Sequence, residues 1–134
     1  MIKVKPFKDM TWDEMMVLYH DLEGRIGYDV QCVSIIGSLD SGKRNYFSLT
    51  EKTLSEIRLN FSDYIFNHVI EFRCYPVLRS MESMTEEELE EYRGTLIELP
   101  NEEYLISTPR TKDWLKSKNF DYNGLIKIGL AGEE

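Results

Sequence analysis

Three segments carry the residue pattern that starts an α-helix, and their positions limit the folds open to this chain. Thr11-Trp12-Asp13-Glu14 and Thr85-Glu86-Glu87-Glu88 are capping boxes, in which the Thr hydroxyl and the Glu carboxylate each accept a hydrogen bond from the other residue's amide. Thr108-Pro109 places a capping residue before a proline at the first helical position. We therefore expect helices that begin close to residues 12, 86 and 109.

The segments around these starts predict the other elements. Apolar residues recur at helical spacing after Thr11, and Gly24 or Gly27 can end that helix. Residues 28–50 contain two β-rich runs around a polar tip, which predicts a β-hairpin. The second helix is expected to end at Gly94. Short strands are expected at 95–99, closed by Pro100, and at 104–106, and the last helix is expected to bury Trp114 and Leu115.

Residues 51–76 fit two patterns. Helical spacing links apolar residues from Leu54 to Phe72, yet residues 57–61 also alternate as a strand would. The sequence favours short, broken elements here, with a strand from about Val69 to Tyr75 that ends at Pro76.

Together these elements predict an α+β fold, with a small antiparallel sheet that includes the hairpin near 28–50 and packs with three to four short helices. The chain has 134 residues, 42% of them hydrophobic, and a chain of this size buries roughly two-thirds of its unfolded surface. No linker or repeat divides it, so we expect one compact domain over residues 1–134.

The sequence predicts a cytoplasmic protein without cofactor or metal. Its longest apolar run, Met15 to Tyr19, is far below the roughly 20 residues of a membrane span, and the N-terminus has no secretory pattern. Cys32 and Cys74 have neither a C-x-x-C spacing nor nearby histidines, so we expect reduced, structural thiols. His20 and His68 lack partners typical of catalysis.

Negative charge is concentrated in one part of this acidic chain. The formal net charge is −8, and the segment from Thr85 to Tyr104 holds eight acids and one base. Lys and Arg form no dense stripe, so direct nucleic-acid binding is not expected. The acids are explained by a solvated helix face whose first turn complements the helix dipole, and the alternative is an acidic patch that binds a partner.

One loop comes close to a nucleotide-binding motif. Residues 37–44, Gly-Ser-Leu-Asp-Ser-Gly-Lys-Arg, match G-x-x-x-x-G-K-[ST] except at Arg44, which has no hydroxyl for magnesium. A helix should follow such a loop, whereas residues 45–49 favour a strand. A hairpin loop in which Gly42 adopts an unusual backbone angle is therefore favoured over an enzyme with a divergent nucleotide loop.

Two further segments resemble the signatures of a family of small uncharacterised proteins of phages, prophages and mobile elements of gut bacteria. The first runs from Leu78 to Glu87 (LRSMESMTEE), with Ser80 where the family commonly has proline. The second, from Phe120 to Ala131 (FDYNGLIKIGLA), matches better. The resemblance implies a setting in a mobile element and no activity.

The residues of these segments have physical roles that need no resemblance. Asp121 can cap a short helix by accepting from the amide of Asn123 or Gly124. Gly124 would allow close approach of a neighbouring element, and Gly129 a left-handed cap. Arg79 is expected to pair with Asp121 or with the turn at Glu86 to Glu88, and a ligand-facing Arg79 is the alternative.

No catalytic constellation emerges, so a non-enzymatic role is favoured over an enzyme. We expect an accessory protein that acts through a protein partner, and the alternative is an acidic inhibitor of a host defence enzyme that acts on nucleic acid. The residues expected to bind are Arg79, Glu86, Glu87, Glu90, Glu91 and Asp121.

Overall fold

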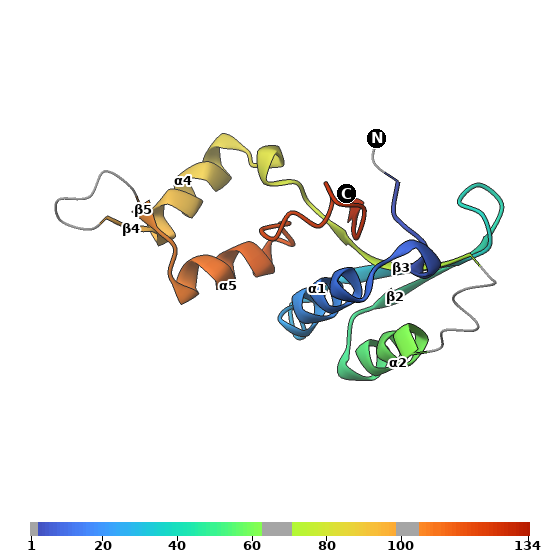
Figure 1. The fold of residues 1–134 in the computed structure, drawn as a ribbon. Coiled ribbons are helices and arrows are strands. Elements are labelled where there is room, and N and C mark those ends of the chain that lie inside the picture. Colours follow the sequence, from blue (N-terminus) through green and yellow to red (C-terminus); the bar gives the residue numbers. More distant parts are fainter. Residues whose placement is uncertain (1–2, 63–70, 99–104) are drawn as a thin grey trace.

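A four-stranded sheet forms the centre of the computed structural model, which describes residues 3–62, 71–98 and 105–134 (Figure 1). The strand order is β2-β1-β3-β6. The strands are β1 (Gln31–Ile36), β2 (Lys43–Ser48), β3 (Phe72–Leu78) and β6 (Gly132–Glu133). Strand β1 is antiparallel to β2 and β3, whereas β6 is parallel to β3. The predicted α+β class and the hairpin at 28–50 are confirmed, and the short C-terminal strand makes the sheet mixed.

Two helices cover one face of this sheet, α1 (Trp12–Glu23) and α2 (Glu51–Ser62). Leu18 and Leu22 of α1 and Leu54 and Ile57 of α2 are at most 4% exposed. They pack in one core with strand residues of the same face, and this core includes Val30, Cys32, Phe72, Cys74 and Leu78. Both cysteines are free and buried, and burial raises the pKa of the Cys32 thiol to about 12, as expected for structural thiols.

The opposite face of the sheet carries a second, smaller core. It consists of Val33, Ile35 and Tyr75 from the sheet and Val4 from the N-terminal segment. The Arg73 guanidinium fixes that segment, since its Nε donates to the Val4 carbonyl at 2.8 Å. Loop 37–42 lies on this side as well, because Leu39 packs on the cluster, and the last residues of the chain form the edge of the sheet, where β6 pairs with β3.

The remaining elements form an arm that extends away from the sheet (Figure 1). It consists of α4 (Glu86–Thr95), the two-residue strands β4 (Ile97–Glu98) and β5 (Leu105–Ile106), and α5 (Pro109–Ser117). Helices α4 and α5 lie side by side, and β4 and β5 pair antiparallel at the far end of the arm. Single-turn 3-10 helices precede α1 and α4, namely η1 (Phe7–Asp9) and η2 (Met81–Ser83). The two short strands predicted in this region are therefore present.

All three predicted helix starts are confirmed at atomic detail. Thr11 accepts from the Glu14 amide and Thr85 from the Glu88 amide, each at 3.1 Å, and the two glutamates accept in return. Thr108 caps α5, where Thr111 takes the position that Glu holds in the other two boxes. These contacts join residues three apart in sequence, which is why sequence alone predicts them.

The sequence predicted short, broken elements over residues 51–76, and this prediction was wrong for residues 51–62. Residues 51–62 form one helix, because burying Leu54 and Ile57 rewards helical spacing over strand alternation. Strand β3 also continues through Pro76 to Leu78. Pro76 is the last residue of β3 that pairs with β1, and pairing with β6 begins at Val77. Proline, which has no amide hydrogen to donate, is therefore tolerated where the pairing of β3 changes from β1 to β6.

Smaller corrections concern glycines and helix ends. Gly37, with φ of 102°, has the unusual backbone angle in the hairpin loop, whereas Gly42 is required because a Cβ there would lie 2.5 Å from the Ser38 carbonyl oxygen. Helix α4 ends at Thr95, one residue beyond Gly94. The predictions for His68, Val69, Leu99, Pro100 and Tyr104 lie outside the described residues. Within the described ranges, no helix is long and apolar enough to cross a membrane.

Candidate functional site

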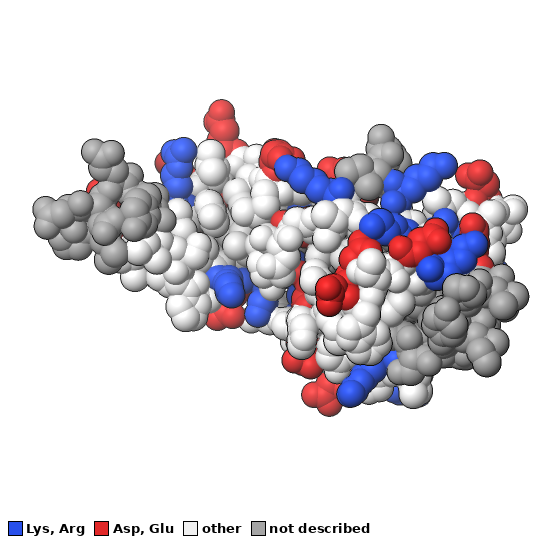
Figure 2. Space-filling view, viewed as in Figure 1, with Lys and Arg blue, Asp and Glu red and all other residues white. Residues whose placement is uncertain are grey.

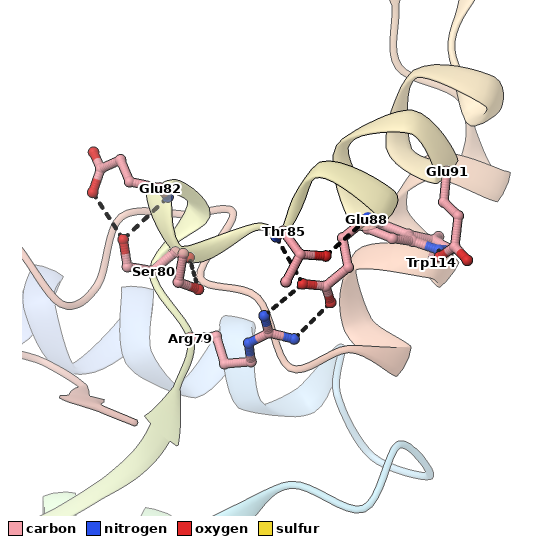
Figure 3. Close-up of polar contacts among 8 residues, drawn as sticks. Arg79, Ser80, Glu82, Thr85, Glu88, Glu91 and Trp114 are labelled. Atoms are coloured by element: carbon pink, nitrogen blue, oxygen red, sulfur yellow. Dashed lines mark hydrogen bonds and ion pairs between the residues drawn. The ribbon is translucent and has the colours of Figure 1, made fainter.

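Arg79, the first residue after β3, holds the start of α4 (Figure 3). Its Nη1 and Nη2 donate to the two carboxylate oxygens of Glu88, both at 2.8 Å. The Arg79 hydrogen bonds, with help from the Thr85 amide, lower the pKa of Glu88 to about 2. The structure thus confirms the predicted pairing of Arg79 with the first turn of α4 and excludes the alternative partner, Asp121.

Arg79 also contacts α5 and the segment that follows it. Its guanidinium carbon lies 4.4 Å from the centroid of the Phe120 ring, and that ring stacks on Trp114 of α5 at 5.7 Å. The backbone of Arg79 is held as well, because its amide donates to Asn119 and its carbonyl accepts from the Asp121 amide, both at 2.8 Å. Arg79 therefore joins β3, α4 and α5, a structural role in place of a ligand-facing one.

The predicted acidic residues of α4 divide into two groups. Glu91 accepts from Trp114 Nε1 at 3.3 Å, so it belongs partly to the α4–α5 contact (Figure 3). Glu86, Glu87 and Glu90 are exposed, and the structure gives them no hydrogen bond or ion pair within the described residues. Helical spacing places these three on one side of α4, whereas Glu88 and Tyr92 lie on the side that contacts Arg79 and α5. We call Glu86, Glu87 and Glu90 the acidic face.

The rest of the visible charge is mixed. On the side of the molecule drawn in Figure 2, Lys and Arg lie among Asp and Glu over the part that carries the sheet. The side of the arm seen in this view is mostly uncharged.

Asp121 organises the backbone of the C-terminal segment. Its side chain is buried and accepts from the amides of Leu125 and Ile126 at 2.8 and 2.9 Å. The sequence predicted that Asp121 caps a short helix through the amide of Asn123 or Gly124. The helix was wrong, because residues 122–129 form turns, and the amides that Asp121 binds lie farther along the chain than expected. Asp121 is therefore not available to a ligand.

The two glycines of this segment have different reasons to be there. Gly129 has the predicted left-handed backbone, with φ of 77°. Gly124 was predicted to allow close approach, yet no atom lies within 4 Å of where a Cβ would be. Its φ of 74° is the reason for glycine, because L side chains rarely adopt that conformation.

A buried ion pair was missed by the sequence analysis. Arg25 Nε donates to Asp21 Oδ1 at 2.6 Å, and both side chains are fully buried. Asn123 Nδ2 donates to the second oxygen of Asp21, and the Arg25 guanidinium carbon lies 4.6 Å from the centroid of the Tyr122 ring. Arg25 Nη1 has no hydrogen-bond partner in the described structure. The spacing of four residues between an acid and a base was the available signal, but sequence does not show burial.

The two signature segments also line a common cavity of about 680 Å³. Ser80, Met81 and Glu82 come from the first segment, and residues of 121–127 come from the second. Tyr75 of β3 and Val4 complete its wall on the sheet side. A cavity of this size lies within the range of small-molecule sites, so it is the second candidate site beside the acidic face.

The described residues support neither a metal site nor a nucleotide-binding loop. Within residues 3–62, 71–98 and 105–134, no three His, Cys, Asp or Glu side chains gather to hold a metal ion. Loop 37–42 runs directly into β2, so Lys43 lies at the start of a strand and no helix N-terminus faces a phosphate there. Comparison with known proteins adds no further guidance: no family model, curated protein or solved structure matches this chain.

Proposed function

We propose that this chain is a non-enzymatic accessory protein of a phage, prophage or other mobile element and that it works by binding a protein partner. The genetic setting rests on the resemblance of residues 78–87 and 120–131 to a family of small uncharacterised proteins of phages, prophages and mobile elements. The mode of action rests on the acidic face, Glu86, Glu87 and Glu90, which is the observation that carries the proposal. The partner surface should be basic, because three unpaired carboxylates complement positive charge.

The way α4 is held supports this role. Its first turn is fixed by the Thr85 cap and by Glu88 bonded to Arg79, and its inner side packs on α5 through Tyr92 and Trp114. A fixed helix presents its carboxylates in one geometry, so little conformational entropy is lost when a partner binds. The neighbouring side chain of Leu89 is 38% exposed and adds apolar area beside the charges.

Affinity capture with charge variants tests the proposal. Glu86→Gln, Glu87→Gln and Glu90→Gln together remove three charges from the acidic face. The matched control, Glu23→Gln with Asp40→Asn and Glu51→Gln, removes three charges from exposed positions elsewhere. The wild type and the control should capture the same host or element protein at about 0.05 M salt, and the capture should fall sharply at about 0.5 M. The acidic-face variant should lose it.

Two results would count against the proposal. Capture of the same partner by the acidic-face variant would show that another surface makes the contact. A partner held equally well at both salt concentrations would show that charge attraction does not drive the binding.

A further inference from the structure

The cavity beside β3 has features of a ligand site that are independent of the acidic face. It lies on the face of the sheet opposite α1 and α2, where Val4, Leu39 and Tyr75 form its apolar wall. The other side is closed by η2 and by the C-terminal segment, which contributes Tyr122 and Ile126. The lining therefore combines a predominantly apolar interior with polar groups at a few positions, as ligand pockets do.

Tyr75 lines this cavity and carries a hydroxyl that can bond to a ligand. Its side chain is 9% exposed, and its hydroxyl forms no hydrogen bond with the described residues. The ring is held in place by Gly132, because a Cβ on that glycine would lie 2.8 Å from Tyr75 Cε2. A ligand atom that bonds to this hydroxyl replaces water, and such an exchange contributes about 0.5 to 1.5 kcal/mol.

Charges of both signs surround the cavity. Lys3 and Lys127 contribute two ammonium groups, and Glu82, Glu133 and Asp121 contribute carboxylates. The Asp121 carboxylate is buried and accepts from the amides of Leu125 and Ile126, whereas the other four groups are exposed. The one ion pair that the structure shows among these groups joins Lys127 to Glu82 at 3.7 Å, with side chains 76% and 78% exposed. Such an exposed pair contributes little stability, so exchanging it for ligand charges costs little.

We propose that this cavity binds a zwitterionic amino acid with a large aromatic side chain. The apolar wall accepts the ring, and the Tyr75 hydroxyl bonds to its polar atom, an indole N–H or a phenol. The lysines bind the carboxylate of the ligand, and the glutamates bind its ammonium group. The balance of the exposed charges around the cavity selects the zwitterion, because a ligand of single charge meets two exposed groups of its own sign as well as two of the opposite sign.

Amide NMR titration with L-tryptophan tests the site. The amides of Met81, Gly124, Ile126 and Gly132 should shift, while those of α2 should not. Tyr75→Phe removes only the hydroxyl and should weaken binding about fivefold or more. Tyr46→Phe, on an exposed tyrosine of β2, is the matched control and should leave the affinity unchanged.

Blocked ligands test the recognition of charge. L-tryptophanamide lacks the carboxylate and N-acetyl-L-tryptophan lacks the ammonium group, so each should bind more weakly than L-tryptophan. Equal affinity of all three would overturn the selection of a zwitterion. Equal binding by Tyr75→Phe and the wild type would overturn the role of the hydroxyl.

The site itself would be overturned if none of the four amides shifted with L-tryptophan at up to about 5 mM, a concentration that detects even weak binding. The triple variant of the acidic face should bind L-tryptophan as the wild type does. Failure of the cavity proposal is therefore distinguishable from failure of the proposed protein contact.

Discussion

Replacing Asp21 by Asn should destabilise the protein more than any exposed substitution, because it leaves the Arg25 charge buried without a counter-charge. Both side chains of the pair are fully buried, and Arg25 already has one unpartnered nitrogen. Breaking such a pair from one side costs about 3 to 5 kcal/mol. For a chain of this length, that loss corresponds to a fall in Tm of roughly 10 to 18 °C.

The neighbouring side chains cannot replace the charge that Asp21→Asn removes. The Tyr122 ring remains beside the Arg25 guanidinium at 4.6 Å, but a cation–π contact contributes only about 2 kcal/mol even when desolvated. The side-chain amide nitrogen that Asp21→Asn introduces would face either the Arg25 guanidinium or the Asn123 amide, and both are donors. Removing both charges with Asp21→Leu and Arg25→Met should instead leave stability within about 1 kcal/mol of the wild type.

Urea unfolding followed by tryptophan fluorescence measures these differences. Trp114 stacks on Phe120 and reports on the contact between the arm and the sheet. Lys127→Met breaks the exposed pair with Glu82 and is the matched control, with an expected change below about 1 kcal/mol. An Asp21→Asn variant within about 1 kcal/mol of the wild type would refute the reasoning, since the charge would then be hydrated. A double variant as unstable as Asp21→Asn would show that packing, not charge, sets the cost.

Two other changes test the contacts around the signature segments. Asp121→Ala leaves the buried amides of Leu125 and Ile126 without an acceptor and should cost about 2 kcal/mol or more, seen by calorimetry as a Tm lower by about 7 °C; an unchanged melting curve would contradict the capping role. The Glu88 pKa of about 2 lies below its ordinary value of 4.5, so its stabilising effect is complete above about pH 4.5 and is lost as the pH falls towards 2. Urea midpoints at about pH 6 and about pH 3 should therefore differ more for the wild type than for Glu88→Gln, and equal differences would show that the ion pair with Arg79 does not stabilise the fold.

Sequence predicted the contacts between residues a few positions apart. The caps at Thr11, Thr85 and Thr108 and the 28–50 hairpin depend on local chemistry, and the structure contains them all. The helix at 51–62 was missed because its pattern fits two periods, and only packing against α1 decides between them.

Contacts between residues far apart in the sequence determine the features that the sequence did not predict. The parallel pairing of β6 with β3 joins residues more than 50 positions apart, and no local pattern marks it. The choice of Glu88 over Asp121 as the partner of Arg79 also depends on three-dimensional placement. In the candidate sites, sequence named the acidic face and found neither the cavity nor the buried Asp21–Arg25 pair, since burial is a property of the assembled fold.

The two signature segments are best understood as one structural junction. The Arg79 amide donates to Asn119 and its carbonyl accepts from Asp121, so the segments are joined by backbone as well as by the contact of Arg79 with Phe120. The next two residues after Asp121 connect this junction to the end of α1. Asn123 donates to Asp21, and the Arg25 guanidinium lies over the Tyr122 ring. Side chains that hold the arm to the sheet in this way are not free to bind a partner. Function is therefore expected beside this junction, namely at the acidic face of α4 and in the cavity that Tyr75 lines.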